Sequence, residues 1–312
     1  DIRGGCSIEG PRTPGEHVDW VYENPMVSPD DVEFFPAVLS FDIETDPSAK
    51  KLLAISLYGC GLKEVLVVDP KSRPLPSGSR SFPTEAAVLR EFCRRVKDAD
   101  PDVLTGWNVI DFDLSVLGRI SRRCGTSLDL GRDVGAVRIR PAQGYFGSGS
   151  ASIPGRLVMD GIDMLRGAFI RMEDFSLDAV ARQVLGEGKA VAGDVRDRAG
   201  EIQHNYDHDL DAFVSYAETD ARLVLEILDS LKLIDLAVAR SRLTGMTPDR
   251  VAASIASFDY LYLSELGRRK VVAPTVRSAD ASVSTAAQSG GHVLEPTIGR
   301  HGNVWVLSLI HI

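Results

Sequence analysis

The order of its apolar segments constrains the fold of this chain more than any other feature. Three strand-like runs follow one another closely, at residues 37–43, 52–58 and 64–68. Helical and strand-like patterns then alternate, with strands expected at 102–107 and 155–160 and helices at 85–96, 109–120, 162–170, 176–185 and from 209 into the 230s. This order predicts an α/β fold, in which a mixed sheet carries helices on its faces.

Two stretches carry no such periodicity. Residues 1–36 are rich in Gly, Pro and acidic residues and are interpreted as the end of a preceding domain. Residues 186–207 are polar and are predicted to form a loop. The first strand candidate therefore begins at residue 37.

Composition and charge narrow the class of protein. The chain has 312 residues, 44% hydrophobic and 25% charged, which is ordinary globular material with a length that suggests about two domains. The net charge of -9 argues against an autonomous binder of duplex DNA, but not against an enzyme that holds a few nucleotides through a metal. Four scattered cysteines fit a reducing compartment, and no apolar run approaches the ~18 residues of a membrane span. The chain starts without Met and is expected to be a fragment.

Two acids stand at the end of the first strand, in Ser40-Phe-Asp-Ile-Glu-Thr45. Side chains alternate along a strand, so Asp42 and Glu44 are expected on one face and Phe41 on the other. Neighbouring carboxylates at the end of an apolar strand repel each other and lose solvation. A divalent cation is the usual reason to tolerate that arrangement.

A third acid lies inside the predicted helix 109–120. Its apolar stripe consists of Val109, Phe112, Val116, Leu117 and Ile120. Asp113 falls within that stripe, and because a lone buried carboxylate is costly, it is expected to have a partner. Asn108, just before the helix, is interpreted on its own as an N-cap.

The helix that starts near residue 209 carries the last pair of interest. Tyr216 and Asp220 are four residues apart and lie on the flank of the buried face. Taken alone, the pair is better explained by a tyrosine at the core boundary and a solvated aspartate.

Together, the strand and the two helices supply four acids: Asp42, Glu44, Asp113 and Asp220. Hard oxygen ligands suit Mg²⁺ or Mn²⁺ better than zinc. Such a cluster can hold two ions about 3.5–4 Å apart, as in enzymes that cleave phosphodiesters in line. A tyrosine hydroxyl, here that of Tyr216, can orient the attacking water without carrying charge.

Three motifs together resemble the exonuclease motifs of family B DNA polymerases. They are D-x-E at Asp42–Glu44, N-x-x-x-F-D at Asn108–Asp113 and Y-x-x-x-D at Tyr216–Asp220, in the order of that family. The first motif alone is common by chance, whereas three in order are specific. Other runs resemble the bacterial DNA polymerase II group of the family, namely residues 100–108, 130–133, 155–162, 175–180 and 185–189. The similarity covers roughly residues 37–306.

The resemblance implies a ribonuclease-H-like (DnaQ-like) domain that removes mispaired nucleotides 3′→5′ from single-stranded or primer-template DNA. It implies two Mg²⁺ or Mn²⁺ ions on the four carboxylates and a water positioned by Tyr216. Asn108 and Phe112 would seat the 3′-terminal nucleotide. The family also implies DNA replication and repair in a bacterial cytoplasm, associated with the nucleoid, and a sliding clamp as partner of a full-length parent.

The resemblance further divides the chain into four segments. Residues 1–36 would end an N-terminal domain, 37–235 would form the exonuclease domain, and 236–306 would begin the polymerase palm. Ser308 stands where the first palm aspartate of the family is expected, and residues 307–312 look like a non-native tail. Nucleotide addition is therefore not expected from this chain.

Alternatives remain open. The chain can be an inactive exonuclease-fold module that binds DNA or serves a structural role, although all four acids are present. A nucleotide-sugar transferase also uses D-x-E, but that hypothesis leaves Asp113 unexplained. His204 and His208 have the i,i+4 spacing of a zinc site and lack a third ligand. Asp160, at a strand end, is interpreted as a helix cap rather than a fifth ligand.

Overall fold

The protein is described here by a computed structural model. It describes residues 5–16, 18–133, 135–140, 149–187, 195–250, 254–273 and 298–302. The chain divides into two compact units, Asp1–Glu265 and Leu266–Ile312. Residues 274–297 of the segment expected to begin the palm, Ser308 and the suggested tail 307–312 lie outside the described residues. The domain boundaries expected from the resemblance stay predictions.

A six-stranded mixed sheet forms the centre of the first unit, in the order β12-β9-β5-β6-β7-β8. Its middle is an antiparallel meander of β5 (Val38–Thr45), β6 (Leu52–Gly59) and β7 (Leu62–Val68). Parallel strands extend it on both sides: β9 (Val103–Gly106) and β12 (Leu157–Asp160) beyond β5, and β8 (Ser79–Phe82) beyond β7. The predicted α/β fold with a mixed sheet is confirmed.

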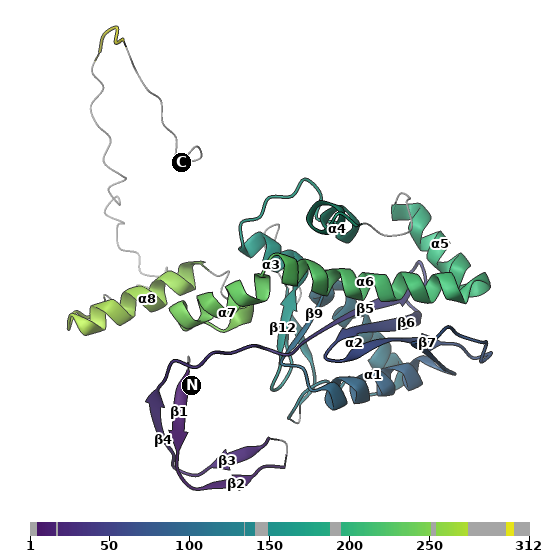
Figure 1. Ribbon diagram of the computed structural model, residues 1–312, viewed down its shortest axis with the longest axis horizontal. Helices are drawn as coiled ribbons and strands as arrows, with labels where there is room; N and C mark the ends of the chain where they lie inside the picture. The colour runs from purple at the N-terminus through teal and green to yellow at the C-terminus, as the bar shows by residue number, and fades with distance from the viewer. Residues whose placement is uncertain are drawn as a thin grey trace, which may run out of the picture. The chain divides into compact units, whose positions relative to one another are not determined.

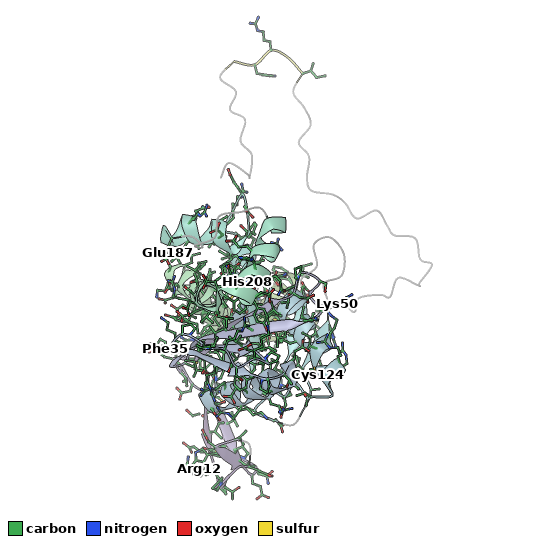
Figure 2. All side chains as sticks on the ribbon, turned by 90° about the vertical axis from the view of Figure 1, so that its right-hand side faces the viewer. Arg12, Phe35, Lys50, Cys124, Glu187 and His208 are labelled. Carbon is green, nitrogen blue, oxygen red and sulfur yellow. The ribbon has the colours of Figure 1, made fainter. Side chains whose placement is uncertain are left out.

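Helices cover both faces of this sheet. In Figure 1, α6 (Leu210–Ser230) runs along one face, whereas α1 (Glu85–Ala99) and α2 (Ser115–Cys124) lie on the other. The larger core packs β5, β6 and β7 against α1 and α2, and includes Leu39, Phe41, Ile43, Ile55, Leu66, Leu89, Phe92 and Leu117. The opposite core packs β6 and β7 against α6 through Ala54, Val65, Val67, Phe213 and Ala217. Side chains fill the space on both sides of the strands (Figure 2).

Further helices follow β12. They are α3 (Gly161–Gly167), α4 (Leu177–Leu185), α7 (Leu233–Thr244), the short 3₁₀ turn η2 (Pro248–Arg250) and α8 (Ser254–Arg268). A small antiparallel pair joins β10 (Arg138–Arg140) to β11 (Ser150–Ser152). Among the described residues, no helix is long and apolar enough to cross a membrane.

Two expectations from the sequence about secondary structure were wrong. The segment expected to be a loop at 186–207 contains helix α5 (Val195–His208), whose polar sequence hides its periodicity. Within the segment interpreted as the end of a preceding domain, β1 (Cys6–Glu9) pairs with β4 (Met26–Pro29) and β2 (Arg12–Pro14) pairs with β3 (Trp20–Tyr22), and that interpretation stays a prediction. The helix expected at 109–120 is two helices, because a π-helical segment, η1 (Val109–Leu114), precedes α2.

A buried ion pair ties the segment after β7 to the end of α5. Asp69 is 1% exposed, and one of its carboxylate oxygens lies 3.0 Å from Arg73 Nε. The same guanidinium donates to the backbone carbonyls of Tyr206, at 2.9 Å, and Asp207, at 3.2 Å. Burial opposes ionisation of Asp69, but the hydrogen bonds and charge of Arg73 outweigh it and lower the pKa. Arg73 therefore donates hydrogen bonds both to the segment after β7 and to the end of α5.

Replacing Arg73 with methionine is expected to reduce the free energy of unfolding by about 3 kcal/mol at pH 7, because a buried carboxylate then lacks its partner. The folded-state pKa of Asp69 is depressed, so this stabilisation is present above the unfolded pKa of about 3.9 and lost as pH falls through the folded value. Urea unfolding between pH 7 and pH 3 measures it. Arg80→Met, which breaks a more exposed pair with Glu91, is the control and is expected to cost less than about 1 kcal/mol. Equal losses in the two variants contradict the prediction.

Candidate active site

Strand β5 carries apolar side chains on one face and acidic side chains on the other. Phe41 and Ile43 are buried in the core against α1 and α2. The alternation of a strand turns Asp42 and Glu44 to the opposite face, which α6 covers. The structure thus places the two acids as the sequence predicted, on the face away from the larger core.

A cluster of three carboxylates forms where β5 meets α6. Asp42, Glu44 and Asp220 each offer one oxygen, and these oxygens lie within 4.8 Å of one another. Glu44 is 6% exposed and Asp220 is 5% exposed, so solvent screens their charges poorly. The interpretation of Asp220 as a solvated aspartate was wrong, since α6 buries it against the sheet. Three acids gathered in this way repel one another unless a cation or protons offset the charge.

The donor set of this cluster fits a hard divalent cation. All three converging atoms are carboxylate oxygens, and among the residues that the structure describes no other group of three or more potential ligands converges. Mg²⁺ and Mn²⁺ bind through such oxygens, whereas structural zinc prefers sulfur and nitrogen. The chemistry of the site therefore agrees with the ions that the sequence suggested.

Tyr216 lies one helical turn before Asp220 on α6. It is 9% exposed and counts among the buried residues of this helix. Residues i and i+4 on a helix are neighbours, which places the phenol on the same flank of α6 as the Asp220 carboxylate.

Asp113 lies outside the three-acid cluster but is held against the same strand. It is 1% exposed, and its Oδ1 accepts a hydrogen bond from the backbone N–H of Ile43 at 3.0 Å. Burial, followed by the nearby charge of Asp42, raises its pKa well above the ordinary value. The expected partner of Asp113 therefore exists, and it is the backbone of β5 between the two acids of the D-x-E motif.

The π-helical segment η1 changes the surroundings of the other predicted residues. Asn108 stands at the N-cap position of η1, as the sequence suggested, but it has left-handed backbone angles (φ 59°, ψ 31°) and makes no side-chain capping bond. Phe112, expected in the buried stripe, is 40% exposed. The wider turn of a π-helix rotates it out of the stripe while Asp113 turns inward. Phe112 therefore presents an aromatic surface one residue from a buried acid.

Asp160 ends β12 and is the cap that the sequence predicted. Its Oδ1 accepts the N–H of Ile162 at 2.9 Å in the first turn of α3, and its Oδ2 accepts the N–H of Ile110 in η1 at 3.4 Å. Burial, followed by the nearby charge of Asp163, raises its pKa to about 6. The bond to η1 was not foreseen, and only the spatial pairing of β9 with β12 reveals it.

The histidine pair does not form a metal site in the described part of the chain. His204 and His208 lie on α5 with ring centroids 4.7 Å apart, and both side chains are exposed. The convergent ligand group among the described residues contains neither of them. The zinc alternative therefore lacks the third ligand that it needs.

Comparison with known proteins points to one family. The family model described as "DNA polymerase family B, exonuclease domain" matches residues 17–180, a range that holds Asp42, Glu44 and Asp113 and stops before α6. The chain is 33% identical over 274 residues to DNA polymerase II of Escherichia coli, which covers 86% of this chain and 34% of that protein.

More distant relatives carry related names. The chain is 28% identical over 294 residues to the DNA polymerase delta catalytic subunit of Schizosaccharomyces pombe, covering 84% of this chain and 26% of that protein. It is 26% identical over 196 residues to the DNA-directed DNA polymerase of Enterobacteria phage T4, covering 61% and 21%. The chain spans about a third or less of the length of these relatives.

Proposed function

Because the chain belongs to family B of the DNA polymerases, through their exonuclease domain, we propose that it is a metal-dependent 3′→5′ exonuclease. Its substrate would be the 3′ end of single-stranded or mismatched primer-template DNA. The mixed sheet flanked by helices is the ribonuclease-H-like arrangement of that domain. The observation that carries the proposal is the convergence of Asp42, Glu44 and Asp220 on one point between β5 and α6.

The proposed site consists of four acids and three accessory residues. Asp42, Glu44 and Asp220 would hold Mg²⁺ or Mn²⁺, with Asp113 completing a site for two ions. When bound, the ions would supply a more acidic water and offset the negative charge that develops on the phosphate. Tyr216 would orient the attacking water, since it is one helical turn from Asp220 on α6.

The 3′-terminal nucleotide would rest on the residues around η1. Phe112 is exposed and offers a face on which a base can stack. Asn108 is exposed at the turn before it and offers an amide for hydrogen bonds. In the proposed reaction the water oxygen bonds to the terminal phosphorus, the bond from phosphorus to the 3′-oxygen breaks, and that oxygen takes a proton. A nucleoside 5′-monophosphate leaves, and the DNA is one nucleotide shorter.

The remaining assignments are also proposals. We propose residues 37–235 as the exonuclease domain, with 1–36 ending an N-terminal domain and 236–306 beginning a polymerase domain. The bacterial nucleoid as the place of action, and a sliding clamp as partner of a longer parent, stay predictions from the resemblance. The alternative is an inactive exonuclease-fold module that binds DNA without cutting it.

End-labelled single-stranded DNA tests the function. With Mn²⁺ or Mg²⁺, a 5′-label is expected to give a ladder of products one nucleotide apart, and a 3′-label is expected to appear at once as a mononucleotide. Excess EDTA should abolish both patterns because the carboxylates alone cannot activate water. Binding of DNA without metal-dependent shortening, in a sample whose fold is verified by circular dichroism, would support the inactive module instead.

A further inference from the structure

A buried carboxylate outside the proposed metal site joins the ends of three elements. Asp160 is 6% exposed and ends β12. Its two oxygens divide their hydrogen bonds between α3, through the N–H of Ile162 at 2.9 Å, and η1, through the N–H of Ile110 at 3.4 Å. One side chain therefore caps the helix that follows it and also the segment that carries Asp113.

The first N–H groups of η1 need such an acceptor. Helix starts leave backbone donors without an intrahelical acceptor, and a residue just before the helix normally supplies one. Asn108 makes no side-chain capping bond, and Ile110 is 6% exposed, so water is a poor substitute. Asp160 supplies the acceptor from a neighbouring strand instead.

The sheet brings Asp160 to this position. Strands β12 and β9 are parallel, and Asp160 is paired with Gly106, two residues before Asn108. The junction is tight, because a Cβ on Gly161 would come within 2.9 Å of Trp107 Cε3 and 3.2 Å of the Gly106 carbonyl oxygen. Trp107 is itself fixed, since its Nε1–H donates to the Phe175 carbonyl at 2.9 Å. The turn from β9 into η1 is therefore clamped on the side that faces β12.

The other end of η1 is fixed against β5. There, Asp113 Oδ1 accepts the N–H of Ile43 at 3.0 Å, between Asp42 and Glu44. Only a few residues separate the two anchor points, and Phe112 lies between them. A shift at the start of η1 is therefore transmitted to both Phe112 and Asp113.

We propose that Asp160 is a positioning residue of the nuclease, which fixes the start of η1 and thereby the places of Asp113 and Phe112. This inference rests on the proposed function for its kinetic consequence, but not for its structural one. Asp160 is not part of the three-oxygen cluster, and its two resolved backbone bonds already occupy one lone pair on each oxygen. Its hydrogen bond to the Ile110 N–H thus acts on the backbone of η1.

The test compares Asp160→Ala with Thr84→Ala in the full chain. Thr84 caps α1 by accepting the Ala87 N–H at 3.2 Å, so its loss removes a helix cap of the same kind from a helix that carries none of the proposed site residues. In Asp160→Ala, kcat for degradation of single-stranded DNA with Mn²⁺ is expected to fall about 10- to 100-fold, as for other residues that orient a metal site from outside it. Thr84→Ala should keep the wild-type kcat even where its melting temperature falls equally.

Hydrogen exchange separates this role from general stability and from activity. The amide of Ile110 is expected to lose protection in Asp160→Ala while amides in α1 keep theirs, and this readout needs neither metal nor DNA. If Asp160→Ala does not fold, Asp160→Asn, which keeps the side-chain volume and one acceptor oxygen, takes its place in both measurements.

Two outcomes overturn the inference: an unchanged Ile110 amide, or a kcat that falls only as far as in Thr84→Ala at matched stability. Wild-type protein that degrades no DNA would sink the proposed function, and the exchange measurement would still decide whether Asp160 holds η1.

Discussion

Replacing Asp42 and Glu44 together by alanine is expected to lower the rate of 3′-end degradation by on the order of 10³-fold or more. Removing one preorganised electrostatic group from a reacting centre already costs about 10²–10³-fold, and this variant removes two of the three converging carboxylates. The measurement is the initial rate on a 5′-labelled primer with a 3′ mismatch, at saturating Mn²⁺. Fold is verified by circular dichroism and urea unfolding.

The matched control removes the same charge from a distant surface. Asp98 and Asp129 pair with Arg94 and Lys97 on the α1 side of the sheet, and both carboxylates are roughly half exposed. Asp98→Ala/Asp129→Ala therefore changes the net charge by the same amount without touching the cluster, and it is expected to keep the wild-type rate. If both double variants cut DNA equally fast, any nuclease in the sample does not use the cluster.

Changing Asp113 to asparagine is expected to separate activity from stability. Asparagine keeps the shape and one oxygen to accept the Ile43 N–H, but it removes a negative charge that is 1% exposed and close to Asp42. The degradation rate should fall about 10²-fold or more, because a charged ligand is lost from the proposed metal site. Stability in EDTA should stay level or rise, since a buried like-charge repulsion disappears.

The same change at Asp111, an exposed acid on the same π-helical segment, is the control. Asp111→Asn is expected to leave the rate within a few-fold of wild type. If Asp113→Asn keeps its activity, the role of Asp113 is only to accept the hydrogen bond from the backbone of β5. A loss of stability above about 1 kcal/mol would instead show that its charge supports the fold, as for a buried, well-bonded carboxylate.

The sheet and its covering helices were predictable because buried strands and helices carry periodic apolar residues in the sequence. Strands β5, β6 and β7 are almost wholly apolar on at least one face and lie within a few residues of their expected limits. Asp113 was informative for the opposite reason: a carboxylate in an apolar stripe implies a partner, and the structure supplies the Ile43 N–H. Apolar strand patterns and a carboxylate within an apolar stripe can therefore be interpreted from the sequence alone, because burial makes other arrangements costly.

The features that escaped prediction depend on backbone geometry or on weak periodicity. A π-helical turn at η1 has no apolar signature of its own, and without it Phe112 was assigned to the core. Helix α5 is polar around most of its circumference, so its residues resemble a loop. The second bond of Asp160 spans two strands that are distant in sequence, and only the β9–β12 register brings it within reach of η1.

The long stretch of chain between β5 and α6 has a consequence for the time course of folding. β5 and β6 form a local hairpin, whereas the carboxylate cluster also needs α6, which is far along the chain from β5. Contacts between distant segments form late, because closing a long loop costs entropy before any contact compensates for it. A molecule in which only the local hairpins have formed has Asp42 and Glu44 in place on β5, but not Asp220 of α6. We therefore expect the proposed capacity to bind an ion to appear only after α6 has docked against β5.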